Sequence, residues 1–374
     1  MTSDGDALRR AVAADPDDDL PRLVYADWLD ETGPARPYPE SERAAARAAL
    51  IRTQVELARL EPLSPAARAA DEVAAGLLRD FRFAWIEHLR PAVSAGGFAR
   101  GFVEHVEVDP VLFPAAAAAV FAAEPVRAVR VARPQTGELR VPLEPLFAVP
   151  HLRQLTALEL PGLGMLQLEY DALARSPHLA GLRSLSLAGN PVPTHWLPDF
   201  LAGPHLPALT ALDLSDIPNL GPAVTRGLTA ATRRSFARLD LTGIVFRSDD
   251  LKQALGSRCI RDVEELRLGW AGPAEGPLTL LDLGWVLPWG RLRALDLAGQ
   301  GLGPEGVREI VRTPAAAGLR SLGLAGNGIG PEGAALLAAA KQLDLYYLDV
   351  RRNGLSLRDA TALRKRFPNA VVVA

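Results

Sequence analysis

The stretch RLRALDLAGQGLGPEGV, from Arg291 to Val307, is followed 27 residues later by GLRSLGLAGNGIGPEGA, from Gly318 to Ala334. Leucines recur at the same three positions of both stretches, and the segment Gly-Pro-Glu-Gly recurs after them. A fixed period of this length indicates that the chain is built from structural repeats.

One repeat has the physical pattern of a short strand followed by a helix. Leu295 and Leu297 alternate with small or polar residues, so one face of a strand is apolar. The glycines of AGQGLG allow a sharp exit from that strand, and Val307, Ile310 and Val311 then recur at helical spacing. A single unit of this kind cannot bury its own apolar face, so it requires neighbours on both sides.

The pattern Leu-x-x-Leu-x-Leu-x-x-Asn resembles the leucine-rich repeat of the ribonuclease-inhibitor-like type. That resemblance implies an α/β solenoid, a horseshoe with a parallel sheet inside and helices outside. The strand pattern extends from Gly101 to a last short strand at residues 370–373. The predicted inward pairs are Val106/Val108, Val129/Val131, Leu158/Leu160, Leu185/Leu187, Leu212/Leu214, Leu239/Leu241, Leu266/Leu268, Leu295/Leu297, Leu322/Leu324 and Leu348/Val350.

The asparagine that follows the strand in this type of repeat is kept in only some units. It is present at Asn190, Asn327 and Asn353. The equivalent residues elsewhere are Ile217, Ile244, Ala271 and Gln300. In those units the turns must satisfy their backbone groups in another way.

The first 95 residues have a different composition, rich in alanine, leucine and arginine, which favours about four helices. The run DPDDDLPRLVYADWL, Asp15 to Leu29, carries most of a resemblance to the repeat-companion domain. That domain is found at the N-terminus of paralogous protein families in certain bacteria, and it implies no known activity. We therefore predict an α-helical domain at 1–95 and a leucine-rich-repeat solenoid at 96–374. The helical domain is expected to cap the solenoid.

Composition excludes several classes of function. The 374 residues carry a net charge of −3, which gives no basic field for nucleic acid. Cys259 is the single cysteine, so neither an intramolecular disulfide nor a cysteine-based metal site is expected. The sequence contains no apolar run long enough to span a membrane and no visible secretory signal, which favours a cytoplasmic protein without a membrane partner.

Several residue patterns resemble ligand sites, and repetition explains most of them. The GNGIGPEG loop at 326–333 resembles a dinucleotide fingerprint, but the adjacent repeat has the same glycine spacing, so no cofactor is expected. His151, His178 and His205 are each 27 residues apart. They could form a zinc-binding ladder, although inheritance through the repeat is the simpler explanation and no metal is predicted.

A lone cysteine and a group of tryptophans complete the candidates. Cys259 is interpreted as a structural thiol. Trp270, Trp285 and Trp289 lie in an irregular region where the step between strands lengthens to 29 residues. They form either the cover of their own loop or an exposed contact patch.

The outward strand positions are the strongest candidates for function. Asp213 and Asp240 should repel each other on adjacent strands, and Arg267 should offset part of that repulsion. The face is either a solvated consensus surface or a docking surface for a partner. The predicted partner-binding residues are Glu159, Asp213, Asp240, Arg267, Asp296, Tyr347, Asp349 and Arg351.

The sequence thus predicts a non-catalytic module that binds an unidentified protein on the concave face of the sheet. The alternative is an enzyme whose active site lies in the helical domain, with the repeats recognising the substrate. Its candidate residues are Asp15, Asp18, Asp27, Tyr25 and Trp28, although helix capping accounts for aspartates in such positions.

Overall fold

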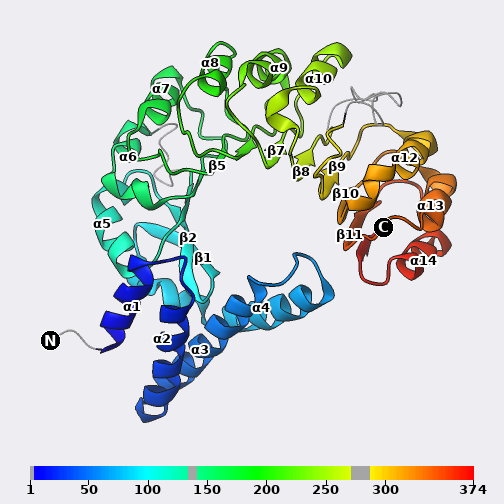
Figure 1. Ribbon diagram of the computed structural model, residues 1–374. Coiled ribbons are helices and arrows are strands. Elements are labelled where there is room, and N and C mark those ends of the chain that lie inside the picture. Colours follow the sequence, from blue (N-terminus) through cyan, green and yellow to red (C-terminus); the bar gives the residue numbers. More distant parts are fainter. Residues whose placement is uncertain (1–3, 134–140, 271–286) are drawn as a thin grey trace. The chain divides into compact units, whose positions relative to one another are not determined.

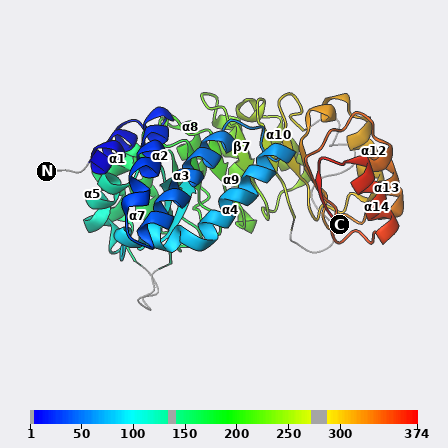
Figure 2. The same cartoon turned by 90° about the horizontal axis from the view of Figure 1, so that it is seen from below.

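The computed structural model describes residues 4–133, 141–270 and 287–374 and divides into two compact units (Figures 1 and 2). Unit 1 contains residues 1–160 with 176–181, and unit 2 contains residues 161–175 with 182–374. In each unit the strands follow one another in chain order, from β1 to β4 in unit 1 and from β5 to β12 in unit 2. This order is the one expected of repeats stacked in sequence.

Unit 1 begins with four helices, as the composition of the first 95 residues predicted. They are α1 (Asp4–Ala14), α2 (Leu20–Thr32), α3 (Glu40–Leu57) and α4 (Pro65–Ile86). The N-cap residue of α2 is Asp19, whose side chain makes no capping hydrogen bond, and Asp18 before it accepts a hydrogen bond from the backbone N–H of Leu20 at 2.9 Å. Ser64 is the N-cap residue of α4 and accepts a hydrogen bond from the backbone N–H of Ala67, with Pro65 in the first turn.

The strands of unit 1 are β1 (Val93–Ala99), β2 (Phe102–Val108), β3 (Ala128–Val131) and β4 (Ala157–Glu159). The hairpin β1–β2 is antiparallel, and β2, β3 and β4 pair in parallel. Arg100 and Gly101 make the hairpin turn with φ of 48° and 81°, the left-handed backbone of a tight primed turn. A Cβ at Gly101 would also collide with Ile51. Helices α5 (Phe113–Ala123) and α6 (Glu144–Phe147) connect the parallel strands.

The N-terminal helices pack directly on β2. Ala26, Ala48, Ile51 and Phe102 belong to one buried cluster that joins α2, α3 and β2. Arg22 of α2 is fully buried beside them and forms an ion pair with Glu104 of β2 at 2.8 Å. It also donates to the backbone oxygen of Pro16 at 2.8 Å, within the same run of sequence. The ion pair with Glu104 therefore connects the Asp15–Leu29 run to β2 through a buried charge.

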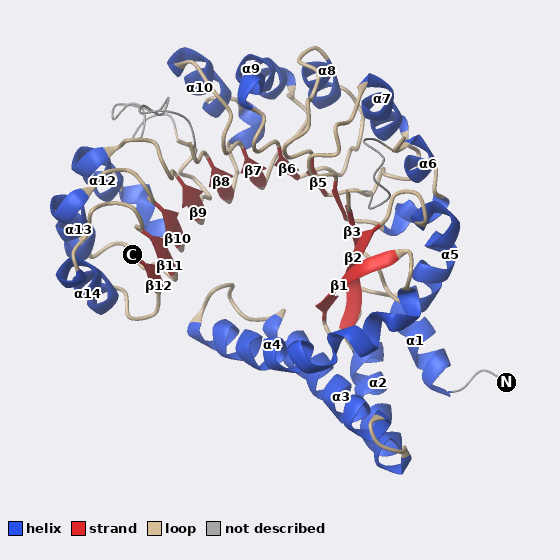
Figure 3. Ribbon diagram, turned by 180° about the vertical axis from the view of Figure 1, so that it is seen from behind, coloured by secondary structure: helices blue, strands red, loops and turns tan. Residues whose placement is uncertain are grey.

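Unit 2 repeats the strand–turn–helix unit that the sequence predicted. Its strands are β5 (Ser184–Ser186), β6 (Ala211–Asp213), β7 (Arg238–Asp240), β8 (Glu265–Arg267), β9 (Ala294–Asp296), β10 (Ser321–Gly323), β11 (Tyr347–Asp349) and β12 (Val371–Val373). Its helices are α7 (Gln167–Arg175), α8 (Trp196–Ala202), α9 (Gly221–Ala230), α10 (Ser248–Leu255), α12 (Gly303–Arg312), α13 (Gly330–Ala339) and α14 (Leu357–Arg366). Figure 3 shows the strands on one side of this unit and the helices on the other.

The predicted inward pairs are all buried, and in unit 2 they pair in register. Leu266 lies opposite Leu295, and Leu295 lies opposite Leu322. The 29-residue step between β8 and β9 therefore does not shift the register. Each of these three leucines is at most 1% exposed. The α/β leucine-rich-repeat fold predicted from the leucine spacing is confirmed.

Buried amides satisfy the turns where the asparagine is kept. Asn353 accepts hydrogen bonds from the backbone N–H groups of Asn327 and Ile329, and donates to the carbonyl of Leu324. Gln300 replaces the asparagine by donating to Leu268 O. Ile217 and Ile244 are buried instead, and there the N–H of Val245 donates to the carbonyl of Pro218 at 3.0 Å. In those turns a backbone hydrogen bond between neighbouring repeats therefore replaces the asparagine side chain, as the sequence led us to expect. The fourth such residue, Ala271, lies outside the described residues.

Replacing Leu295 with aspartate should unfold the repeats, because it places a carboxylate without a partner between two buried leucines. We expect a loss of about 4 kcal/mol or more in the free energy of unfolding, measured by chemical denaturation. Asp296→Asn is the matched control, since its amide oxygen can keep the local hydrogen bond and face outward. Equal losses in the two variants would show that the strand register is wrong.

A chain that starts at Gly101 should be less stable than the full chain or should aggregate. The deletion removes β1 and the helices that cover Phe102, and it leaves an open strand edge. Thermal unfolding and size-exclusion chromatography measure this effect. A soluble monomer with an unchanged unfolding midpoint would instead mean that the segments on either side of the predicted 95/96 boundary fold independently.

Candidate functional site

Seven of the eight predicted partner-binding residues lie on strands, on the side opposite the buried leucines, and Arg351 lies in the turn that follows β11. We call the outward surface of β6 to β11 the strand face. Arg267 and Arg351 are exposed on it, whereas Asp349 is only 8% exposed. The half-buried members of this surface are Asp213, Asp240, Asp296 and Tyr347. Glu159 belongs to β4 in unit 1, where Arg130 pairs with it at 2.6 Å.

The recurring aspartates have a local structural role that the sequence pattern did not reveal. Asp213, Asp240, Asp296 and Asp349 each accept a hydrogen bond from the backbone N–H two residues later, at 2.9 to 3.1 Å. Ser186 makes the equivalent bond at 3.4 Å. This bond satisfies a donor where each strand ends. The acidic consensus on the strand face is therefore explained without a ligand.

The charges on the strand face are partly neutralised. Burial raises the pKa of Asp240, and the charge of Asp213 acts in the same direction, while Thr242 and Arg267 oppose the rise. Arg267 lies 3.7 Å from Asp240 and 2.6 Å from Glu265. The predicted repulsion and its offset by Arg267 are both present.

Arg351, which follows β11, is an exposed cation held by paired hydrogen bonds. Its Nε and one terminal nitrogen donate to the two oxygens of Asp349, at 3.0 and 2.7 Å. Burial raises the pKa of Asp349, but these hydrogen bonds outweigh burial and hold the pKa below its usual range. Asp349 thus positions Arg351 beside Tyr347, and Arg351 remains accessible to a partner.

Two of the three regularly spaced histidines stack on aromatic rings. His151 stacks on Phe121 at 5.8 Å between ring centroids, and His205 stacks on Phe200 at 6.2 Å. A ring nitrogen of His205 also lies 3.1 Å from the carbonyl oxygen of Ala174. Among the residues that the structure describes, no group of three or more His, Cys, Asp or Glu side chains could hold a metal ion.

The cysteine is buried, as expected of a structural thiol. Cys259 is 0% exposed, and its thiol donates to the carbonyl of Leu228 at 3.2 Å. Burial raises the pKa of this thiol, which disfavours the reactive thiolate. Of the three tryptophans, Trp289 is buried, Trp270 is half-buried, and Trp285 lies outside the described residues.

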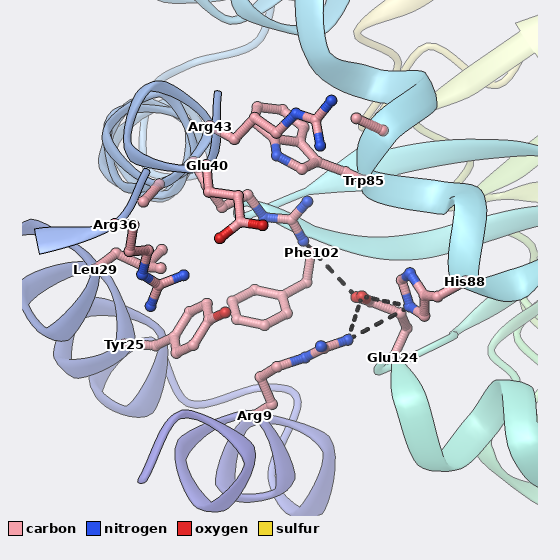
Figure 4. A pocket seen from close by; sticks show the side chains of 13 residues that line it. Arg9, Tyr25, Leu29, Arg36, Glu40, Arg43, Trp85, His88, Phe102 and Glu124 are labelled. Atoms are coloured by element: carbon pink, nitrogen blue, oxygen red, sulfur yellow. Dashed lines mark hydrogen bonds and ion pairs between the residues drawn. The ribbon is translucent and has the colours of Figure 1, made fainter. Parts of the chain in front are cut away.

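A pocket of about 260 Å³ in unit 1 was not predicted from the sequence (Figure 4). Helices α1 to α4, strand β2 and the end of α5 all contribute to its walls. The charged lining residues are Arg9, Arg36, Arg43, Arg47, Glu40 and Glu124, and His88 adds an imidazole. Tyr25, Trp85 and Phe102 supply its aromatic surfaces.

Glu124 lies at one wall of this pocket, next to Arg9, Arg47 and the imidazole of His88 (Figure 4). One carboxylate oxygen lies 3.0 Å from Arg9 and 3.4 Å from His88, and the other lies 3.9 Å from Arg47. The second oxygen also accepts a hydrogen bond from the backbone N–H of Val103 at 3.1 Å. Burial raises the pKa of Glu124, but His88, Arg47 and Arg9 outweigh it and lower the pKa below 4.5.

The aspartates proposed for a catalytic site in the helical domain do not line this pocket. Asp15 is exposed, Asp18 accepts a hydrogen bond from the N–H of Leu20, and Asp27 forms a surface ion pair with Arg52 at 2.7 Å. Tyr25 does line the pocket, and Trp28 stacks on it at 5.6 Å. The signal for the pocket in the sequence is Glu124, a lone carboxylate that ends an otherwise apolar run of alanine, valine and phenylalanine.

Comparisons with known proteins add little to this picture. No family model matches the chain, and no curated protein matches it. The structure of a TLR13–ssRNA13 complex is 17% identical with a TM-score of 0.35, covering 67% of this chain and 39% of that chain. An internalin from Listeria monocytogenes is 14% identical with a TM-score of 0.31, covering 67% of this chain and 80% of that chain.

The chain thus spans well under half of the TLR13 chain. Similarities as low as these carry no argument about function, and the fold follows from the strands, helices and register described above. Within the described ranges, no helix is long and apolar enough to cross a membrane.

Glu124→Gln should destabilise the protein by about 3 kcal/mol, because it leaves Arg9 and Arg47 without their buried counter-charge. The exposed pair Glu87–Arg90 supplies the control Glu87→Gln, which should cost less than about 1 kcal/mol. Since the folded-state pKa of Glu124 is lowered, its contribution is present above pH 4.5 and is lost as the pH falls below that value. Chemical denaturation at neutral and acidic pH should therefore show a difference between wild type and variant that shrinks in acid. A difference that grows in acid would contradict the assignment.

Proposed function

We propose that the chain is a non-catalytic protein-interaction module whose partner binds the strand face at the C-terminal repeats. The observation that carries the proposal is a set of three residues on or next to the strands: the exposed Arg267 of β8, the half-buried Tyr347 of β11 and the exposed Arg351 that follows β11. Arginine and tyrosine are enriched among the residues that dominate binding energies at protein interfaces. Carboxylates already fix both guanidinium groups, so little side-chain entropy is lost when a partner binds them.

The proposal also includes the type of repeat, the identity of the N-terminal domain and the location of the protein. Strand, turn and helix alternate in every described repeat of unit 2, which supports the ribonuclease-inhibitor-like type. The Asp15–Leu29 run supports a repeat-companion domain of a bacterial, cytoplasmic protein, with the helices of residues 1–95 capping the repeats of 96–374. The structural roles of Asp18 and Asp27 favour a binding protein over an enzyme of the helical domain.

The local hydrogen bonds decide which residues test the proposal. Asp296 and Asp349 would be poor choices for charge reversal, because both satisfy a backbone donor at a strand end. Arg267→Gln combined with Arg351→Gln removes the two exposed charges, and glutamine can still donate to the neighbouring carboxylates. After capture of the partner from the native cell, we expect its affinity to fall about tenfold.

The control is a second double variant, Arg308→Gln with Arg312→Gln, on the helical side of the same repeats. Both control arginines make surface ion pairs within α12, so the fold should be unaffected. Isothermal titration calorimetry of both variants decides between the surfaces. If binding follows the helix variant and not the strand variant, the strand face is not the docking surface.

A further inference from the structure

The pocket of unit 1 contains a buried cation whose donors are not used. Arg47 is 8% exposed and lines the pocket, yet its guanidinium group makes no hydrogen bond with any residue in the described part of the chain. Its nearest carboxylate oxygen, on Glu124, is 3.9 Å away. A guanidinium has five N–H donors, and buried donors are normally satisfied, so an acceptor is missing here.

Aromatic rings stabilise the charge of Arg47 without satisfying these donors. The guanidinium carbon lies 5.0 Å from the ring centroid of Trp85, 4.9 Å from that of Phe98 and 5.4 Å from that of Phe102. Cation–π attraction of this kind is electrostatic and provides no oxygen acceptor for the N–H groups. The nitrogens of Arg47 are not sealed in protein either, unlike Nε of Arg22. They therefore remain available to a group inside the pocket.

Two further arginines on the same pocket lack carboxylate partners. Arg36 stacks over Trp28 at 4.9 Å and donates to the hydroxyl of Thr32 at 3.2 Å. The side chain of Arg43 makes no hydrogen bond or ion pair with the described residues. Figure 4 shows both side chains at the pocket, across from Arg9 and His88. Four arginines against the glutamates Glu40 and Glu124 leave the lining with two positive charges in excess.

The shape and the apolar walls restrict what could supply the missing acceptor. A volume of about 260 Å³ is near the lower limit of small-molecule sites, which start at roughly 300 Å³. Tyr25, Leu29 and Trp85 offer apolar surface next to the arginines. Guanidinium groups bind carboxylates and phosphates through paired hydrogen bonds.

We propose that this pocket binds a small organic anion, in which a carboxylate or phosphate group is attached to a compact apolar or aromatic body. The anionic group pairs with Arg47 and Arg43, and the body packs against Tyr25 and Trp85. Glu124 holds Arg9 and fixes the back of the pocket, while the excess positive charge attracts the ligand. This site is independent of the strand face, so either proposal can fail without the other.

Calorimetric titration of the full chain tests the site with three probes that share a phenyl ring. Benzoate carries the carboxylate, phenyl phosphate carries the phosphate, and benzamide is the neutral control. We expect at least one anion to bind one-to-one with a Kd of about 1 mM or tighter, and benzamide to bind at least tenfold more weakly. If only one of the two anions binds, that result shows whether the natural ligand carries a carboxylate or a phosphate group.

Variants connect the binding to the named arginines. Arg43→Gln removes an exposed charge that has no protein partner, so it should fold normally and weaken anion binding at least threefold. Arg47→Gln should weaken it at least tenfold. Arg82→Gln, on α4 and outside the pocket, should bind like the wild type. The proposal is overturned if neither anion saturates the protein, if benzamide binds equally well, or if Arg43→Gln leaves the affinity unchanged.

Discussion

The structure depends on the fact that a single repeat cannot bury its own leucines. Each strand offers one or two inward side chains, and these become buried only when the next strand aligns with them. The pairing of Leu266, Leu295 and Leu322 in register is the result. The same constraint explains why β8 and β9 keep their register across a longer connection, since a shift of one residue would turn the leucines of β9 to the other side of the sheet. It also explains why the first parallel strands need cover from another element, which the hairpin β1–β2 and the helices α2 and α3 provide within unit 1.

In unit 1, buried ion pairs connect the N-terminal helices to β2 and to the end of α5. Arg22 of α2 meets Glu104 of β2, and Arg47 of α3 and Arg9 of α1 meet Glu124 at the end of α5. In each case an arginine of the N-terminal helices faces a glutamate of the strand-containing part. Arg9 also donates to the carbonyl of Ala123 at 3.1 Å, so it offsets the negative end of α5. Removing one partner of such a pair is costly, which makes the docking of the helices specific. The pocket lies where these charges leave a guanidinium without an acceptor.

The sequence predicted the repeats well because their signal is local and repeated. Leucine spacing predicted the position of every described strand of unit 2, and the amino-acid composition of residues 1–95 predicted four helices. Strand β1 was missed, since VSAGGFA contains two glycines and little of the β-branched character of a strand. The pocket was missed because its residues come from five helices and a strand, far apart in the sequence. The strand-face residues were placed correctly on strands, but only hydrogen bonds could show that Asp213, Asp240, Asp296 and Asp349 serve their own backbone. That result moves the expected function from the aspartates to Arg267, Arg351 and Tyr347.

The central claim is that the strand face of unit 2 is the surface that meets a partner. Hydroxyl-radical footprinting of the chain, free and in complex with the partner captured from its native cell, tests this claim most directly. Tyr347 is half-buried on the strand face, whereas Leu357, which begins α14, is 86% exposed. The account predicts that the partner protects Tyr347 from oxidation and leaves Leu357 as reactive as in the free chain. Protection of Leu357 with unchanged oxidation of Tyr347 would contradict it.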